Sequence, residues 1–283
     1  MMTNLIDHTT DLTFLHLTDL HLTAAPDLLV NSRSPAQKLA MLLTRIRELE
    51  VRPAFVLVTG DLVNGGSPDE YDFLQTELEQ LEQLGVPILL ALGNHDARRP
   101  FRQVILGEAP NNLSAPYYHS TMIDGLNVIV LDSHLPGEVS GYIDAEQLAW
   151  LDAELAKPMT LGHLVALHHP PVPATVRLLD SLGLNNADAL AAVVCRHPNV
   201  LGVLSGHIHY HHVAAFANTI SYTTPAVIYT IDPGVTDNLR ILDGSGFSIG
   251  TVHNGQLLMN TVMLPGAQEE LAYRVITEAD LAG

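Results

Sequence analysis

The chain has 283 residues and a formal net charge of −18, from 13 Lys+Arg against 31 Asp+Glu. That charge has the wrong sign for binding a phosphate backbone, so we expect no nucleic acid polymer among its partners. Hydrophobic residues make up 47% of the chain and charged residues only 16%. This low charged fraction indicates extensive burial, part of which we expect in the interface of a homodimer or higher homo-oligomer.

The N-terminal stretch and the cysteine content bear on the cellular compartment. Residues 1–19 contain no basic segment ahead of an apolar run, unlike a signal peptide. No apolar run reaches the roughly 18 residues that a membrane helix needs. Cys195 is the only cysteine, so no disulfide can form within the chain, which fits a reducing compartment. We therefore expect a soluble, cytoplasmic protein without a membrane partner.

Short apolar runs alternate with helical patterns as far as residue 204. The predicted strands, rich in Val, Leu and Ile, are residues 14–17, 54–58, 87–92, 127–131, 163–167 and 200–204. The predicted helices are residues 34–50, 67–85, 144–157 and 186–196. Ser34-Pro35 and Ser67-Pro68 open the first two of these helices as N-cap and first helical residue. Near-continuous apolarity is typical of strands covered on both faces, so the alternation predicts a layered α/β domain.

The pattern changes near residue 220. Residues 221–233 and 247–264 are predicted to form strands, and the second segment is interrupted by Asn254-Gly255, a strong hairpin turn. We see no linker or repeat in the sequence. We therefore predict a core over residues 1–220 and a β-rich C-terminal extension over residues 221–283, which completes the fold and could also contribute to a dimer interface.

Metal-ligand side chains follow five of the predicted strands, at the point where each apolar run stops. In chain order they are Asp19, His21, Asp61, Asn94, His95, Asp96, His168, His169, His207 and His209. The carboxyl ends of strands in a layered α/β fold share one edge, where ligands bind. For each motif taken alone, a turn, a structural histidine or a solvated loop is the favoured explanation. Their common position after five strands favours a shared site.

The types of side chain indicate the kind of site. Carboxylate, amide and imidazole ligands without thiolates suit Mn, Fe or Zn rather than a structural zinc site. Seven candidate ligands are too many for one ion and suit two ions about 3.5–4 Å apart, the arrangement that clamps a phosphorus centre during displacement.

The order of the motifs resembles the calcineurin-like metallophosphoesterases. The matching blocks are Asp19-x-His21, Gly60-Asp61, Gly93-Asn94-His95-Asp96, His168 and Gly206-His207-x-His209. Within that superfamily, "GDLVNGGSPDEY", "LDSHLPGEVSGYIDAEQLAWLDAEL", "LHHPPVP" and "GFSIGTVHNGQLLMNTVMLPG" are most similar to the bacterial class III cyclic nucleotide phosphodiesterases and glycerophosphodiesterases. The resemblance implies a four-layer α/β/β/α sandwich with two central sheets.

The resemblance also implies a role for each residue. One ion would be bound by Asp19, His21 and His209, the second by Asn94, His168 and His207, and both by the bridging Asp61. His95 matches the proposed general acid of the family, and Asp96 would orient it. Asn94, His95 and His209 would contact the substrate. Asn64 stands where many relatives carry Asp and matches no direct ligand, so we expect only an indirect effect there.

We therefore expect hydrolysis of a small phosphodiester, of the cyclic nucleotide or glycerophosphodiester type, by a hydroxide that bridges two metal ions, with His95 as general acid. Fe and Mn are the favoured metals, with Zn and Mg as alternatives. A phosphomonoesterase or nucleotide pyrophosphohydrolase with the same metal centre stays open, as does a non-catalytic scaffold of the same fold. The sequence assigns no definite role to Arg98, His134, Tyr210 or His211.

Overall fold

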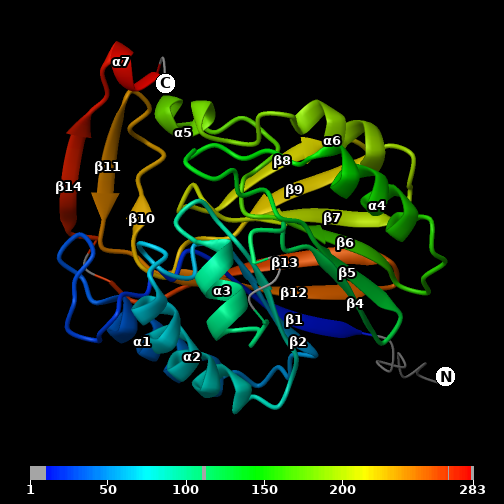
Figure 1. The fold of residues 1–283 in the computed structure, drawn as a ribbon, viewed down its shortest axis with the longest axis horizontal. Coiled ribbons are helices and arrows are strands. Elements are labelled where there is room, and N and C mark those ends of the chain that lie inside the picture. Colours follow the sequence, from blue (N-terminus) through cyan, green and yellow to red (C-terminus); the bar gives the residue numbers. More distant parts are fainter. Residues whose placement is uncertain (1–10, 110–112, 267, 282–283) are drawn as a thin grey trace, which may run out of the picture.

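Two β-sheets form the centre of the structure (Figure 1). The computed structural model describes residues 11–109, 113–266 and 268–281. The first sheet has the strand order β13-β12-β1-β2-β3. Its strands are β1 (Leu12–Leu17), β2 (Phe55–Thr59), β3 (Ile88–Ala91), β12 (Gly246–His253) and β13 (Gln256–Met263). β1, β2 and β3 run parallel, and β12 pairs antiparallel with both β1 and β13.

The second sheet has the strand order β4-β5-β6-β7-β9-β8. Its strands are β4 (His119–Ile123), β5 (Leu126–Val130), β6 (Gly162–Ala166), β7 (Val200–Ser205), β8 (His212–Phe216) and β9 (Thr219–Thr223). β5, β6, β7 and β9 run parallel, while β4 and β8 are antiparallel at the two edges. The carboxyl ends of the parallel strands in each sheet are where the predicted ligand motifs begin.

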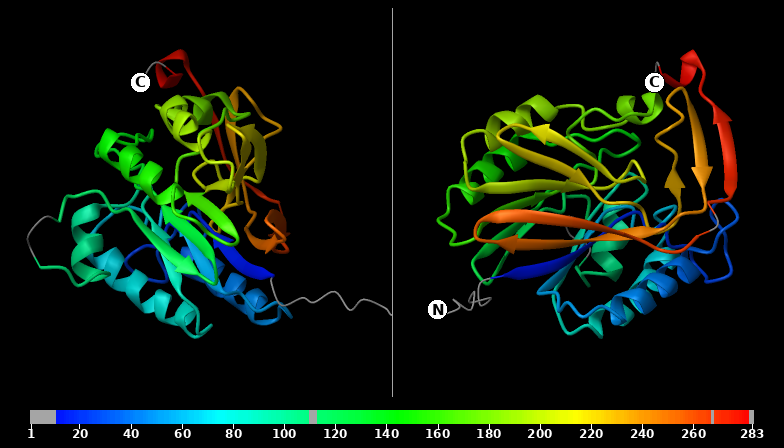
Figure 2. Two further views of the ribbon diagram at one scale, coloured as in Figure 1. Left: turned by 90° about the vertical axis from the view of Figure 1, so that its right-hand side faces the viewer. Right: turned by 180° about the vertical axis from the view of Figure 1, so that it is seen from behind.

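Helices cover the outer face of each sheet (Figures 1 and 2). They are α1 (Pro35–Arg47), α2 (Pro68–Glu82) and α3 (Arg98–Val104) on the first sheet, and α4 (Ala145–Leu155) and α6 (Ala187–Val194) on the second. The short α5 (Arg177–Ser181) and α7 (Glu278–Leu281) lie beside the C-terminal strands. Three buried apolar clusters fill the spaces between these four layers. The predicted α/β/β/α sandwich is therefore confirmed.

The near-continuous apolar runs have a simple structural reason. In β1, Phe14 faces the second sheet while Leu15 faces the helices, and in β2 the same alternation places Phe55 inward and Val56 outward. The Phe14 and Phe55 rings stack with centroids 4.8 Å apart. Gly250 of β12 lies so close that a Cβ there would meet the Phe14 ring at 2.1 Å. Both faces of these strands are buried, so both faces are mainly apolar, and the buried polar side chains of His16 and Thr59 hydrogen-bond to each other at 2.9 Å.

The predicted starts of the first two long helices are confirmed. The Ser34 side chain accepts a hydrogen bond from the Gln37 N–H at 3.2 Å and caps α1. Ser67 and Glu70 form a reciprocal capping box at the start of α2. Pro35 and Pro68 occupy the first helical position of each helix, where a missing N–H costs nothing.

A third, small sheet is formed by β10 (Thr230–Ile231), β11 (Asn238–Leu242) and β14 (Glu270–Val275). The predicted boundary at residue 220 falls inside β9, and β12 and β13 belong to the first sheet. The C-terminal segment thus contributes to all three sheets. The division of the chain into a core over residues 1–220 and an extension over residues 221–283 stays a prediction. The same holds for a contribution of the extension to a dimer interface.

None of the described helices is long and apolar enough to cross a membrane. The prediction about a signal peptide concerns residues 1–19, of which 1–10 lie outside the described residues.

An ion-pair network fastens the turn between β11 and β12 to helix α1. Asp243 accepts hydrogen bonds from Lys38 and, at 3.0 Å, from the Arg33 Nε–H. The side chains of Lys38 and Asp243 are only 11% and 14% exposed. The Lys38 charge therefore depends on Asp243 for compensation, and the Asp243 charge is compensated by Lys38 and Arg33 together.

We expect Asp243→Ala to lower the free energy of unfolding by about 3 kcal/mol, because it leaves the Lys38 ammonium group without its partner. The matched control is Glu48→Ala, which breaks the exposed pair between Arg45 and Glu48 at 3.3 Å on the same helix and should cost about 0.5 kcal/mol or less. Urea denaturation measures both. If Asp243→Ala and Glu48→Ala lowered the free energy of unfolding equally, the ion-pair network would not hold the C-terminal strands to α1.

Candidate metal centre

The loops that follow β1, β2, β3, β6 and β7 meet at one edge of the two sheets, as predicted. Backbone hydrogen bonds join them in pairs. The Asp19 N–H donates to the Gly60 carbonyl at 3.1 Å, and the His21 N–H donates to the Asp61 carbonyl at 2.9 Å. The Gly206 N–H donates to the carbonyl of His168 at 3.0 Å. Backbone hydrogen bonds therefore join the first motif to the second and the fourth motif to the fifth. The side chain of Asp61 joins the third motif, because it accepts a hydrogen bond from the His95 N–H.

Five of the seven predicted ligands have a left-handed backbone. They are Asp19 (φ 51°), His21 (φ 47°), Asp61 (φ 48°), His207 (φ 74°) and His209 (φ 61°). This conformation is uncommon for residues other than glycine, although Asp and His adopt it more readily than most. Each instance costs on the order of 1–3 kcal/mol and persists only where the surrounding structure enforces it. Such strain gathers at functional sites, and five of the eleven non-glycine residues with a positive φ in the described part of the chain are predicted ligands.

Asp61 lies at the middle of the cluster. Its Oδ2 is 3.5 Å from His21 Nε2 and 3.4 Å from His168 Nε2, while its Oδ1 accepts a hydrogen bond from the His95 N–H at 2.9 Å. Gly93 packs directly on this carboxylate, since a Cβ there would lie 2.2 Å from Asp61 Oδ1. One carboxylate thus contacts both halves of the predicted centre.

Asp19, His21 and His209 form the first half. His209 Nε2 is 3.3 Å from both Asp19 Oδ1 and His21 Nε2, and His21 Nε2 is 3.8 Å from the same Asp19 oxygen. All three side chains are buried. The other Asp19 oxygen accepts a hydrogen bond from the His207 N–H at 3.0 Å, which links this half to the second. Three ligand atoms at these separations can bind one cation.

Asn94, His168 and His207 are the predicted ligands of the second half, and their ligand atoms form no hydrogen bond with the described residues. Asn94 Oδ1, His168 Nε2 and His207 Nε2 are buried without a hydrogen-bond partner in the described part of the chain, and so is Asp19 Oδ1. Leaving such atoms unpaired costs about 1–3 kcal/mol each. Asp19 Oδ1 and His168 Nε2 do lie 3.3 Å from His209 Nε2 and 3.4 Å from Asp61 Oδ2, respectively. A bound cation would satisfy all of these buried ligand atoms, so the residues present fit a metal.

Backbone carbonyls set the orientation of two imidazoles. The Nδ1 of His168 lies 2.7 Å from the Thr59 carbonyl oxygen, and that of His209 lies 3.1 Å from the Tyr229 carbonyl oxygen. When Nδ1–H donates to a carbonyl, Nε2 keeps its lone pair for a metal. The Tyr229 ring also stacks on His209, with centroids 4.4 Å apart. Sequence reasoning missed Thr59 and Tyr229, because a carbonyl partner leaves no signature in residue type.

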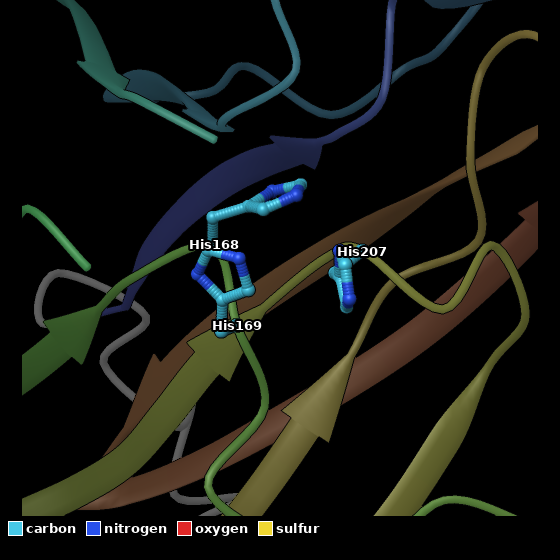
Figure 3. Close-up of side chains that lie close together, drawn as sticks. All are labelled: His168, His169 and His207. Carbon is cyan, nitrogen blue, oxygen red and sulfur yellow. The ribbon is translucent and has the colours of Figure 1, made fainter. Parts of the chain in front are cut away.

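His169 differs from its neighbour His168 (Figure 3). Its Nδ1 is 2.8 Å from the Ser133 hydroxyl and its Nε2 is 3.0 Å from the Val139 carbonyl oxygen. Both ring nitrogens are therefore occupied. The ring packs against His207 with centroids 4.7 Å apart. This arrangement supports the choice of His168 over His169 as the ligand.

The structure corrects the expected partner of His95. The His95 Nδ1 lies 2.7 Å from the backbone carbonyl oxygen of Asn64, whereas the Asp96 carboxylate bonds to other groups. Asp96 accepts hydrogen bonds from the N–H groups of Leu62, Val63 and Gly93 and from the Tyr71 hydroxyl, at 2.8–3.3 Å. Asp96 therefore fastens the β2 and β3 loops together, and the Asn64 carbonyl orients the His95 ring.

Burial and neighbouring charges shift the pKa values of the candidate ligands. Burial alone would raise the pKa of Asp61, but the neighbouring His168 and His21 outweigh it and hold that pKa well below its usual range. Burial would lower the pKa of His168, yet the Asp61 charge raises it to about 9. Burial lowers the pKa of His21 to about 4 and that of His207 to about 3. Ionised carboxylates and neutral imidazoles are the forms that bind metals. Asp61, His21 and His207 are already in these forms near neutral pH, whereas His168 must release its proton when a cation binds.

The remaining residues near the motifs lie outside the cluster. Tyr210 is buried, and its hydroxyl accepts a hydrogen bond from the Thr175 N–H at 3.1 Å. His211 is exposed and packs beside Tyr222, and His212 begins β8. Of the histidines between residues 207 and 212, His207 and His209 lie in groups of side chains that could hold a metal ion, and their role as ligands stays a prediction.

Comparison with known proteins gives one consistent family. The calcineurin-like phosphoesterase family profile matches residues 12–211. The chain is 35% identical over 261 residues to a cAMP/cGMP dual specificity phosphodiesterase of Mycobacterium tuberculosis, covering 91% of this chain and 81% of that protein. It is 30% identical over 194 residues to the glycerophosphodiester phosphodiesterase GpdQ of Enterobacter lignolyticus, covering 68% and 69%. A dimetal phosphatase from Danio rerio has the same fold, with a TM-score of 0.63, 18% identity and coverage of 89% and 98%. The chain therefore belongs to the calcineurin-like phosphoesterase family.

Proposed function

We propose that this protein hydrolyses small phosphodiesters at a centre of two metal ions that share Asp61. The observation that carries the proposal is the position of Asp61 Oδ2, 3.5 Å from His21 Nε2 and 3.4 Å from His168 Nε2. A single oxygen between ligands of both halves suits a bridging carboxylate. Relatives named as cyclic nucleotide and glycerophosphodiester phosphodiesterases support the class of substrate.

The assignment of ligands follows the two halves of the cluster. Asp19, His21, His209 and Asp61 would hold one ion, and Asn94, His168, His207 and Asp61 would hold the other. Oxygen and nitrogen ligands without thiolate suit Fe or Mn, with Zn and Mg as alternatives. When bound, such ions supply positive charge for an anionic diester and lower the pKa of water toward neutrality.

His95 is suited to protonate the leaving oxygen. Its ring lies 4.6 Å from the His21 ring, at the border of the centre, and its Nδ1 is held by the Asn64 carbonyl. The other ring nitrogen, Nε2, is therefore the one that can face the substrate. A positioned acid of this kind contributes about 10²- to 10⁴-fold to the rate. Asn94 and His209 border the same space and would contact the phosphate as well as a metal. The homo-oligomer and the cytoplasmic location stay predictions.

A substrate panel tests the reaction class. With Mn²⁺ added, we expect faster hydrolysis of bis(p-nitrophenyl) phosphate and 3′,5′-cyclic AMP than of p-nitrophenyl phosphate. A strong preference for the monoester, or for a nucleotide pyrophosphate, would replace this proposal by the corresponding alternative. Fewer than one bound ion per chain together with no hydrolysis would favour a non-catalytic scaffold.

Asp61→Asn should lose one or both ions and reduce diester hydrolysis by about 10³-fold or more, because the shared ligand charge disappears and the ions supply several kcal/mol of transition-state stabilisation. The control is Asp69→Asn, an exposed carboxylate in the first turn of α2, which should change neither property. Elemental analysis of the purified protein counts the ions. Two ions per chain in Asp61→Asn would contradict the bridging role.

His95→Ala should keep both ions but slow the hydrolysis of esters with alkoxide leaving groups by about 10²- to 10⁴-fold. Esters of p-nitrophenol should be affected much less, because that leaving group needs no proton. His211→Ala removes an exposed histidine just past the last ligand motif and serves as the control. An equal rate loss on both kinds of leaving group would argue against the acid role.

A further inference from the structure

A pocket of about 420 Å³ opens directly beside His95. It lies between the loop after β3, the start of α3 and the loop after β5. Lining residues include Gly65, Asn94, Ala97, Arg99, His134 and Pro136. The volume falls in the range of roughly 300–1,000 Å³ that is typical of small-molecule sites. Asn94 is the one predicted metal ligand among the lining residues, so most of the space is available to another part of the substrate.

The pocket is held in shape by a buried ion pair. The Arg98 Nε–H donates to Asp132 Oδ2 at 2.8 Å, and its Nη2–H donates to the His134 carbonyl at 2.6 Å. The other Asp132 oxygen accepts a hydrogen bond from the His134 N–H at 3.0 Å, and Asp132 is completely buried. The loop after β5 is thereby fixed to the start of α3. A preformed cavity of this kind loses little entropy when a ligand binds.

The position of His95 determines which part of the substrate faces the pocket. The His95 ring stands between the His21 ring, 4.6 Å away, and the pocket that it helps to line. If His95 protonates the leaving oxygen, the group attached to that oxygen extends past His95 into the cavity. This step rests on the proposed function.

Two side chains of the pocket have unused binding capacity. Arg99 is exposed and forms no ion pair with the described residues. His134 lines the pocket and is 8% exposed. Its Nδ1 is buried, so Nε2 is the ring nitrogen that is left to meet a ligand. Burial lowers the pKa of His134, so the neutral ring has one donor and one acceptor nitrogen. Asp96 also borders the pocket, but its carboxylate is occupied by backbone N–H groups and the Tyr71 hydroxyl.

We propose that this pocket binds the nucleoside part of the substrate, and that Arg99 and His134 select it over smaller alcohols. A guanidinium group stacks on flat aromatic rings and donates hydrogen bonds in one plane, which suits a nucleobase. A neutral imidazole can pair with a ribose hydroxyl or a ring nitrogen. A three-carbon alcohol such as glycerol would leave most of the 420 Å³ empty.

The test compares 5′-AMP with inorganic phosphate, since the two differ only by the nucleoside. Calorimetric titration of the Mn²⁺-loaded full chain should show tighter binding of AMP than of phosphate. Arg99→Gln and His134→Ala should each weaken AMP binding by about tenfold and leave phosphate binding within about twofold. The KM for 3′,5′-cyclic AMP should rise by a similar factor with little change in kcat. Arg45→Gln, on the exposed face of α1, is the matched control.

Two outcomes would overturn the pocket assignment. One is equal binding of AMP and phosphate by the unsubstituted protein. The other is an equal loss of AMP and phosphate affinity in the two variants, which would indicate a general disturbance of the centre. A failure of the proposed function can be distinguished from these outcomes. If the protein cleaves only monoesters, the affinities of the two variants for AMP and for phosphate still show whether Arg99 and His134 recognise the nucleoside.

Discussion

The contact of one carboxylate with three separate loops is the constraint on which the centre depends. Asp61 Oδ1 accepts the His95 N–H, while Oδ2 faces the Nε2 atoms of His21 and His168. The approach is so close that Gly93 has no room for a Cβ. A displacement of any of these loops would change the distances to Asp61. The geometry of the candidate centre is thus a property of the packed loops together and not of one motif.

The strained loops are held by a rigid frame. Five left-handed ligand residues cost free energy, and the apolar central strands of the two sheets, which are buried on both faces, offset it. Asp96 adds a local clamp, since its carboxylate binds N–H groups from both the β2 and the β3 loop. This explains why an aspartate follows Asn94 and His95 without touching the His95 ring. Its contribution to any reaction is to hold the loop that carries both residues.

The sequence predicted the features that depend on side-chain type. Buried strands, capped helices and the polar residues after each strand follow from apolar runs, Ser-Pro pairs and strand ends, and the structure contains them. It did not predict the edge strands β4 and β8, which are only half-buried and carry mixed residues. Nor did it predict that carbonyls of Thr59, Asn64 and Tyr229 hold the histidine rings. Any residue supplies a carbonyl, so such partners become visible only when the chain is folded.

The C-terminal strands take part in the centre as well as in the fold. Ile208 and Tyr210 alternate with the ligands His207 and His209, and both pack in an apolar cluster with Ile231 of β10. Because His207 and His209 are two residues apart, both ligands lie on one side of the loop. Ile208 and Tyr210 lie on the other side, where they anchor the loop in the apolar cluster. The Thr230 hydroxyl donates to the His209 carbonyl at 3.0 Å, next to the Tyr229 carbonyl that holds the His209 ring. Because β10 orients this histidine, residues well beyond the ligand motifs help to determine how tightly one of the two proposed ions is held.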